Sequence, residues 1–133
     1  MARIKDTSYL LDTHTAIWFL NGSDELSITA KNAILDLSSL KYVSIVSAWE
    51  IAIKIGLGKL DFEGKVAGFI QLAETNEITV LPVKTAHLTV LESLPLIHRD
   101  PFDRLLVATA LAEQMTLITA DENIAKYTVH HIW

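Results

Sequence analysis

The segment from residue 98 to residue 112 constrains the fold more than any other part of this 133-residue sequence. Asp100 precedes Pro101, and proline is favoured at the first helical position. The pattern therefore predicts a helix with Asp100 as its N-cap and Asp103 in its first turn. After that turn the segment is almost wholly apolar, with Thr109 as the polar exception. A helix that is apolar on all sides belongs inside a protein, so we expect a buried helix that opens with two carboxylates.

Short β-rich segments alternate with amphipathic segments along the rest of the chain. We expect strands over residues 9–11, 42–46, 78–83, 116–119 and 129–133, and helices over 16–20, 30–37, 47–55, 66–73, 85–94, 101–112 and 122–127. Strands that alternate with helices through short loops form parallel sheets covered on both faces. The pattern predicts a three-layer α/β/α fold whose central, mainly parallel sheet has four to five strands.

Several polar residues indicate where these elements begin and end. Ser27 or Thr29 is expected to cap the second helix, and Thr85 the helix that follows the third strand. Ser47 and Glu50 have the spacing of a capping box at the start of the third helix. Pro82 lies in the third predicted strand and places that strand near an edge of the sheet.

The composition is that of a single hydrophobic domain spanning residues 1–133. Mean hydropathy is +0.32, yet no apolar run approaches the roughly 18 residues of a membrane span. The surplus of apolar residues therefore suggests a surface that is covered by a partner. The segment containing Arg3 and Lys5 lacks the pattern of a signal peptide, and the absence of cysteine is compatible with the cytoplasm.

Four acidic residues are expected at one edge of the sheet. Asp12 follows the first strand, Glu50 lies in the helix after the second, Asp103 opens the buried helix, and Asp121 follows the 116–119 strand. Ligands of such sheets bind beyond the carboxyl ends of the strands. Each acid also has a structural explanation, because carboxylates cap helices and hold turns.

A cation would stabilise such a cluster. Two carboxylates about 5 Å apart repel by roughly 3 kcal/mol at an effective dielectric constant of 20. Oxygen ligands without any cysteine favour a hard ion, so Mg²⁺ or Mn²⁺ is expected rather than zinc. Such ions lower the pKa of bound water and stabilise charge on phosphoryl oxygens, which is the chemistry of phosphodiester hydrolysis.

Four segments in this order resemble the PIN-domain ribonucleases, and among them the VapC-like toxins of toxin–antitoxin pairs. They are Leu10-Leu11-Asp12-Thr13-His14, Ser47-Ala48-Trp49-Glu50-Ile51-Ala52-Ile53-Lys54, His98-Arg99-Asp100-Pro101-Phe102-Asp103-Arg104-Leu105-Leu106 and Thr119-Ala120-Asp121. The resemblance implies an acidic metal site formed by Asp12, Glu50, Asp103 and Asp121. It implies Thr13 and Thr119 as supporting hydroxyls, and it leaves Asp100 as a cap. It also implies a homodimer and an antitoxin whose helical tail covers an apolar groove.

The net charge of −5 means that the molecule as a whole repels polyanions, so contact with RNA must be local. Lys54, Arg99 and Arg104 are the basic residues nearest the acids and are the candidate contacts. Trp18, Phe19 and Trp49 could stack on bases, but packing in the core or an interface is the favoured use. We expect a metal-dependent endoribonuclease.

Two alternatives remain open at this stage. Asp12-Thr13-His14-Thr15 is similar to the nucleophile loop of aspartyl-phosphate phosphatases, although the second acid of that loop is missing. That chemistry requires a covalent intermediate at Asp12. In the non-enzymatic alternative, a partner-binding α/β domain, the four acids only cap helices.

Overall fold

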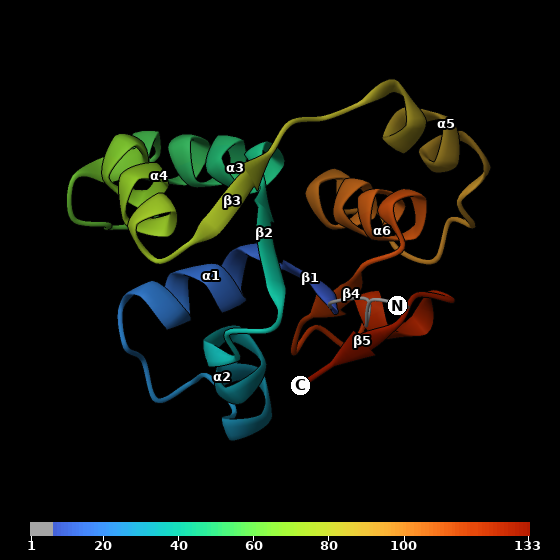
Figure 1. Cartoon of the computed structure of the whole chain (residues 1–133). Helices are drawn as coiled ribbons and strands as arrows, with labels where there is room; N and C mark the ends of the chain where they lie inside the picture. The colour runs from blue at the N-terminus through green and yellow to red at the C-terminus, as the bar shows by residue number, and fades with distance from the viewer. Residues whose placement is uncertain (1–6) are drawn as a thin grey trace.

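The computed structural model describes residues 7–133, which form an open sheet of five parallel strands (Figure 1). The strands are β1 (Ser8–Leu11), β2 (Leu40–Ser44), β3 (Ile78–Leu81), β4 (Thr116–Ile118) and β5 (His131–Ile132). Their order across the sheet is β3-β2-β1-β4-β5. The expected fold class is confirmed. The residues on which the expectation about a signal peptide rests lie outside the described part of the chain.

Helices connect the strands and cover the two faces of the sheet (Figure 1). They are α1 (Thr13–Leu20), α2 (Ile28–Leu35), α3 (Ile45–Gly56), α4 (Lys65–Thr75), α5 (Thr85–Ser93) and α6 (Pro101–Glu113), followed by the short 3-10 helix η1 (Ile124–Lys126). α1, α2 and α4 pack on one face, and α6 and η1 on the other. α5 packs against the outer side of α6.

Successive side chains along each strand point to opposite faces of the sheet. Leu11 and Ile118 belong to the core cluster beneath α1, α2 and α4, whereas Leu10 and Leu117 belong to the cluster beneath α6. All four side chains are fully buried. A strand buried on both faces is a continuous apolar run, which explains the short hydrophobic segments in the sequence.

The first turn of α6 agrees with the sequence-based prediction. Pro101 is its first residue, and one oxygen of the Asp100 side chain accepts hydrogen bonds from the backbone N–H groups of Phe102 and Asp103 at 2.9 and 3.1 Å. The helix is buried from Leu106 to Ala110. Asp100 is therefore the cap, and the Asp103 side chain is available for another role.

The boundary between β2 and α3 differs from the prediction. The strand ends at Ser44 instead of residue 46, and Ser44 caps α3 by accepting a hydrogen bond from the backbone N–H of Val46 at 3.0 Å. Ser47 lies inside the helix and is fully buried, so the predicted capping box with Glu50 is wrong. Tertiary packing overrides the strand preference of the β-branched residues, because Val46 fills the core beneath α6.

Other boundaries also shift. α1 begins at Thr13, so the predicted polar turn is the first turn of a helix capped by Asp12. Ser27 caps α2, but Leu37 lies beyond that helix and is 92% exposed. Thr85 is the first residue of α5 instead of its cap. The two predicted elements after residue 121 are shorter in the structure than the sequence suggested.

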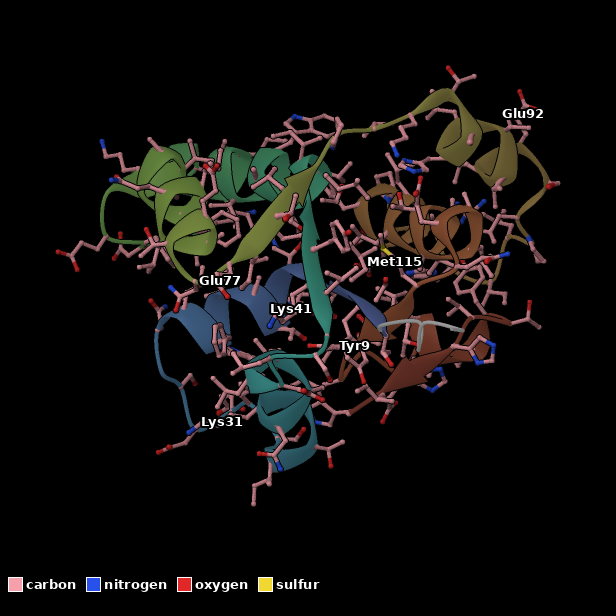
Figure 2. All side chains as sticks on the ribbon, in the orientation of Figure 1. Tyr9, Lys31, Lys41, Glu77, Glu92 and Met115 are labelled. Carbon is pink, nitrogen blue, oxygen red and sulfur yellow. The ribbon has the colours of Figure 1, made fainter. Side chains whose placement is uncertain are left out.

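Charged side chains project from the surface of this core. Lys31, Glu77 and Glu92 extend into solvent, whereas Met115 lies between α6 and the sheet (Figure 2). β3 is an edge strand, as expected, and it ends at Leu81, before Pro82, instead of at residue 83. No helix within residues 7–133 has both the length and the apolar character that crossing a membrane requires.

Candidate active site

The candidate site lies where the strand order reverses. The chain moves from β1 to β2 and β3 on one side of the sheet and then crosses to β4 on the other side of β1. Ligands of open parallel sheets bind at this kind of switch point, beyond the carboxyl ends of the strands. Asp12 follows β1 directly, and Thr119 follows β4 directly. The backbone N–H of Asp12 donates to the carbonyl oxygen of Ile118 at 3.2 Å, which joins the two strand ends.

Asp12 is held in a fixed orientation by two hydrogen bonds. Its Oδ1 accepts from the backbone N–H of Thr15 at 2.8 Å, and its Oδ2 accepts from the hydroxyl of Thr119 at 2.5 Å. Only 5% of the residue is exposed. Burial raises the pKa of the Asp12 carboxyl, and these hydrogen bonds oppose that rise because they stabilise the charged form.

Glu50 extends from α3 toward the start of α1. Its Oε1 accepts from the Thr13 hydroxyl at 2.8 Å, and its Oε2 lies 2.6 Å from Nζ of Lys54. The hydroxyl oxygens of Thr13 and Ser47 are 2.9 Å apart, so Thr13 lies between two polar groups of α3. Thr13 and Thr119, expected as supporting hydroxyls, each donate a hydrogen bond to one of the four carboxylates.

Asp103 lies near two of the other acids. Burial is the largest cause that raises its pKa to about 6, followed by the negative charge of Asp100. The charges of Asp121 and Glu50 raise it further, whereas a hydrogen bond from His98 lowers it. Part of the rise in the pKa of Asp103 therefore comes from the negative charge of neighbouring acids.

Asp121 has one occupied and one available oxygen. Its Oδ1 accepts from the backbone N–H groups of Asn123 and Ile124 at 2.7 and 3.2 Å, and its own N–H donates to Oγ1 of Thr119 at 3.0 Å. Within residues 7–133, Oδ2 of Asp121 and Oδ1 of Asp103 accept no hydrogen bond. Asp121 therefore holds the turn before η1, whose N-cap is Asn123, and one of its oxygens accepts no hydrogen bond from residues 7–133.

The four acids therefore lie at one edge of the sheet, but their side chains do not converge on a single point. Asp12 and Asp121 line one cavity of about 150 Å³, together with His14, Trp18 and Ala120. As the side chains stand, no three His, Asp or Glu residues in the described chain are arranged to hold a metal ion. The donor set nevertheless fits a hard divalent cation, because it offers carboxylate oxygens, two of them unbonded.

Aromatic rings form one wall of this cavity. The rings of His14 and Trp18 stack with centroids 5.7 Å apart, and the Trp18 ring also lies 5.7 Å from that of Trp133. Trp49 does not line this cavity; its ring contacts that of Phe102 edge-on, and the residue is 58% exposed.

The three candidate RNA contacts have different environments. Lys54 is paired with Glu50, and Arg99 is exposed beside an apolar hollow that Leu96 and Pro101 also line. Arg104 donates hydrogen bonds to the carbonyl oxygens of Leu94 and Pro95 and to the Tyr127 hydroxyl. These bonds favour a structural role for Arg104 over contact with RNA.

Tyr127 and His98 contact each other beside Asp103, and the sequence motifs did not indicate this contact. Nδ1 of His98 lies 2.9 Å from the Tyr127 hydroxyl, and Nε2 lies 3.4 Å from Oδ2 of Asp103. Tyr127 is 29 residues from His98 in sequence, and no local pattern marks it.

Comparison with known proteins identifies the family. A model of the PIN domain matches residues 9–129 of the chain. Ribonuclease VapC22 of Mycobacterium tuberculosis is 30% identical over 123 residues, which cover 91% of this chain and 92% of that protein. The chain therefore belongs to the PIN-domain family, and the resemblance to VapC-like proteins seen in its motifs is confirmed.

Solved structures agree with this assignment at the level of the fold. VapBC2 from Rickettsia felis, bound to a DNA fragment from its promoter, matches with a TM-score of 0.73 and 14% identity, over 96% of this chain and 99% of that chain. DNA-bound VapBC from Salmonella typhimurium matches with a TM-score of 0.71 and 14% identity, over 95% and 97%.

Proposed function

We propose that this PIN domain is an endoribonuclease that depends on Mg²⁺ or Mn²⁺ and hydrolyses phosphodiester bonds in single-stranded or looped RNA. One observation carries the proposal. Asp12 and Asp121 line one cavity at the switch point of the sheet, and Asp103 and Glu50 lie close enough for the charge of Glu50 and of Asp121 to act on Asp103. If the four acids only capped helices, bringing their charges together would not stabilise the protein.

The roles of the acids follow from their surroundings. Asp12, Asp103 and Asp121 would hold the cation, with Glu50 as a further ligand or as the base that accepts a proton from water. Thr119 fixes the orientation of Asp12, and Thr13 fixes that of Glu50. When bound, the divalent cation supplies Lewis acidity and offsets the charge of the scissile phosphate.

The cavity also offers a surface for the nucleobase. Single-stranded RNA is commonly held by stacking of its bases on aromatic side chains. The rings of His14 and Trp18 line the same cavity as Asp12 and Asp121. A base that stacks there would bring its phosphate toward the carboxylates. Lys54 and Arg99 would contact neighbouring phosphates.

A partner is proposed from exposed apolar surface. Ile45, Trp49 and Ile53 recur every four residues on α3, Leu57 follows as its C-cap, and each of the four is at least 39% exposed. The solved structures that match this chain are named as VapBC pairs. We therefore infer that the chain is the toxin of such a pair, that it forms a homodimer, and that a cognate antitoxin covers part of its apolar surface.

The phosphatase alternative is less compatible with the sequence. Its nucleophile loop needs a second acid two residues after Asp12, where this chain has His14. The non-catalytic alternative predicts that divalent cations leave the stability of the protein unchanged.

The direct test is cleavage of a labelled single-stranded RNA by the purified chain. We expect cleavage with added Mg²⁺ or Mn²⁺, none in excess EDTA, and recovery when the cation is restored. Full activity in EDTA with trace metals excluded would contradict the proposal. Sedimentation of the same preparation tests self-association. A strict monomer that has no affinity for an antitoxin would contradict the proposed homodimer and toxin–antitoxin pair.

A further inference from the structure

A chain of three side chains, Arg104, Tyr127 and His98, leads to Asp103. Arg104 Nη1 donates to the hydroxyl oxygen of Tyr127 at 3.1 Å, and that hydroxyl lies 2.9 Å from Nδ1 of His98. Nε2 of His98 faces Oδ2 of Asp103 at 3.4 Å. The rings of His98 and Tyr127 meet edge to face, with centroids 5.5 Å apart. The His98 side chain is 12% exposed, and Tyr127 is 4% exposed.

The hydroxyl of Tyr127 decides the direction of these hydrogen bonds. Its oxygen accepts from Arg104 Nη1 and, at 3.4 Å, from the backbone N–H of His98. A phenolic hydroxyl has one proton to donate, and Nδ1 of His98 is its only acceptor among residues 7–133. Nδ1 must then be free of a proton. In a neutral ring the proton resides on Nε2, which faces Asp103.

We propose that Arg104 and Tyr127 lock His98 in its Nε2–H tautomer, so that His98 donates to Asp103 and holds that carboxylate in the orientation the acidic site needs. All three are positioning residues, because none of them reaches the cavity that Asp12 and Asp121 line. Partners of this kind, one step removed from the ligands, commonly set ligand orientation and metal affinity. The inference rests on the proposed function only where it assigns Asp103 to a metal site.

The same hydrogen bonds explain why an arginine occupies position 104. Its guanidinium joins the carbonyl oxygens of Leu94 and Pro95 to Tyr127, so the segment between α5 and α6 is fastened to the segment after β4. His98 belongs to that fastened segment. Its ring therefore has little freedom to turn, and the N–H that it presents to Asp103 is fixed in place.

The tautomer can be read directly by NMR. A two-bond ¹H–¹⁵N spectrum of histidine-labelled protein above pH 8 distinguishes ring nitrogens that carry a proton from those that do not. His98 is assigned by its disappearance in His98→Gln. We expect wild-type His98 to be the Nε2–H tautomer, and Tyr127→Phe to convert it to a mixture. Tyr42→Phe removes a hydroxyl elsewhere and should leave it unchanged. A wild-type Nδ1–H tautomer, or an unaltered tautomer in Tyr127→Phe, would overturn the proposal.

Mn²⁺ binding to the same proteins tests the consequence for Asp103. Loss of a positioning partner typically weakens metal affinity by 10- to 100-fold, so we expect a loss of about tenfold in Tyr127→Phe and none in Tyr42→Phe. Equal affinity in wild type and Tyr127→Phe overturns the positioning role. If the tautomer and affinity change as expected but no protein cleaves RNA, the ribonuclease proposal fails while the positioning of Asp103 stands.

Discussion

The hydroxyl of Thr119 donates a hydrogen bond to Oδ2 of Asp12 over 2.5 Å, although the two residues are 107 positions apart in sequence. Each residue follows the end of one of two adjacent parallel strands, β1 and β4. The bond therefore forms only when those strands pair in the correct register, and it orients the most deeply buried acid of the site. Folding and assembly of the acidic cluster are coupled at this contact.

Replacing Thr119 with valine tests this coupling. The variant keeps the shape of the side chain but removes the donor to Asp12 and the acceptor for the N–H of Asp121. We expect the free energy of unfolding to fall by about 1–3 kcal/mol, measured by urea titration, and RNA cleavage to fall with it. Thr79→Val, at an exposed position of β3, is the matched control and should stay within about 0.5 kcal/mol. Unchanged stability and full cleavage in Thr119→Val would argue against the coupling.

In the proposed site, Lys54 would compete with a cation for Glu50. Its Nζ lies 2.6 Å from Oε2 of Glu50, and its side chain is 39% exposed. Only Lys54 is partly exposed, whereas the Glu50 side chain is 8% exposed, so Lys54→Gln should lower stability by about 0.5–1 kcal/mol. Mn²⁺ affinity should rise by roughly 1 kcal/mol, or about fivefold, because a nearby positive charge is lost. Calorimetry measures this affinity, and Lys59→Gln, which changes an exposed lysine after α3, is the control. Weaker Mn²⁺ binding in Lys54→Gln would exclude competition.

Trp18 should affect binding of RNA more than chemistry. Stacking of a base on an aromatic side chain contributes about 1–3 kcal/mol. We therefore expect Trp18→Leu to raise KM for single-stranded RNA by about fivefold or more and to leave kcat within about twofold. Phe19→Leu changes an aromatic residue of the same helix outside the cavity and should leave KM unchanged. A fall in kcat at constant KM would instead mean that the change disturbs Asp12.

The raised pKa of Asp103 predicts a pH dependence of stability without metal. The pKa rises from the ordinary 3.8 to about 6 in the folded protein, so the folded state binds the proton more tightly than the unfolded state. Stability therefore falls as pH rises from about 4 to about 6 and is constant above that range. An asparagine side chain cannot ionise, so the stability of Asp103→Asn relative to wild type should increase across this window by roughly 1–2 kcal/mol. Urea titrations in EDTA at pH 4.5, 6 and 7.5 measure the difference. A constant difference would show that the pKa of Asp103 is not raised in the folded protein.

Local chemistry made parts of this structure predictable. Asp100 and Pro101 specify the start of α6 through capping and a fixed backbone angle, and both depend only on neighbouring residues. The alternation of apolar strands with amphipathic helices specified the parallel sheet, and the switch point then placed the acids at one edge. Whether the four acids and a cation form a working site stays a prediction.

The features that sequence did not reveal depend on distant residues. Ser44 and Ser47 both follow a β-rich segment, and only packing of Val46 beneath α6 decides which serine caps α3. Tyr127 lies in an irregular segment after β4, where nothing local signals its contact with His98. The motifs also did not indicate that Lys54 would pair with Glu50 or that His98 would contact Asp103. Both carboxylates are expected to face a cation.

The most direct measurement compares wild type with Asp103→Asn in thermal melts, with EDTA and with Mn²⁺, beside an RNA cleavage assay. Asp100→Asn is the control, because asparagine caps a helix as well as aspartate and this variant should keep both Mn²⁺ binding and cleavage. The account predicts that Asp103→Asn melts higher than wild type in EDTA, gains less from Mn²⁺ and loses most cleavage, since like-charge repulsion exceeds the roughly 0.3–1 kcal/mol of the helix dipole. A variant that melts lower in EDTA, keeps the wild-type shift with Mn²⁺ and still cuts RNA would contradict the metal site and the ribonuclease mechanism built on it.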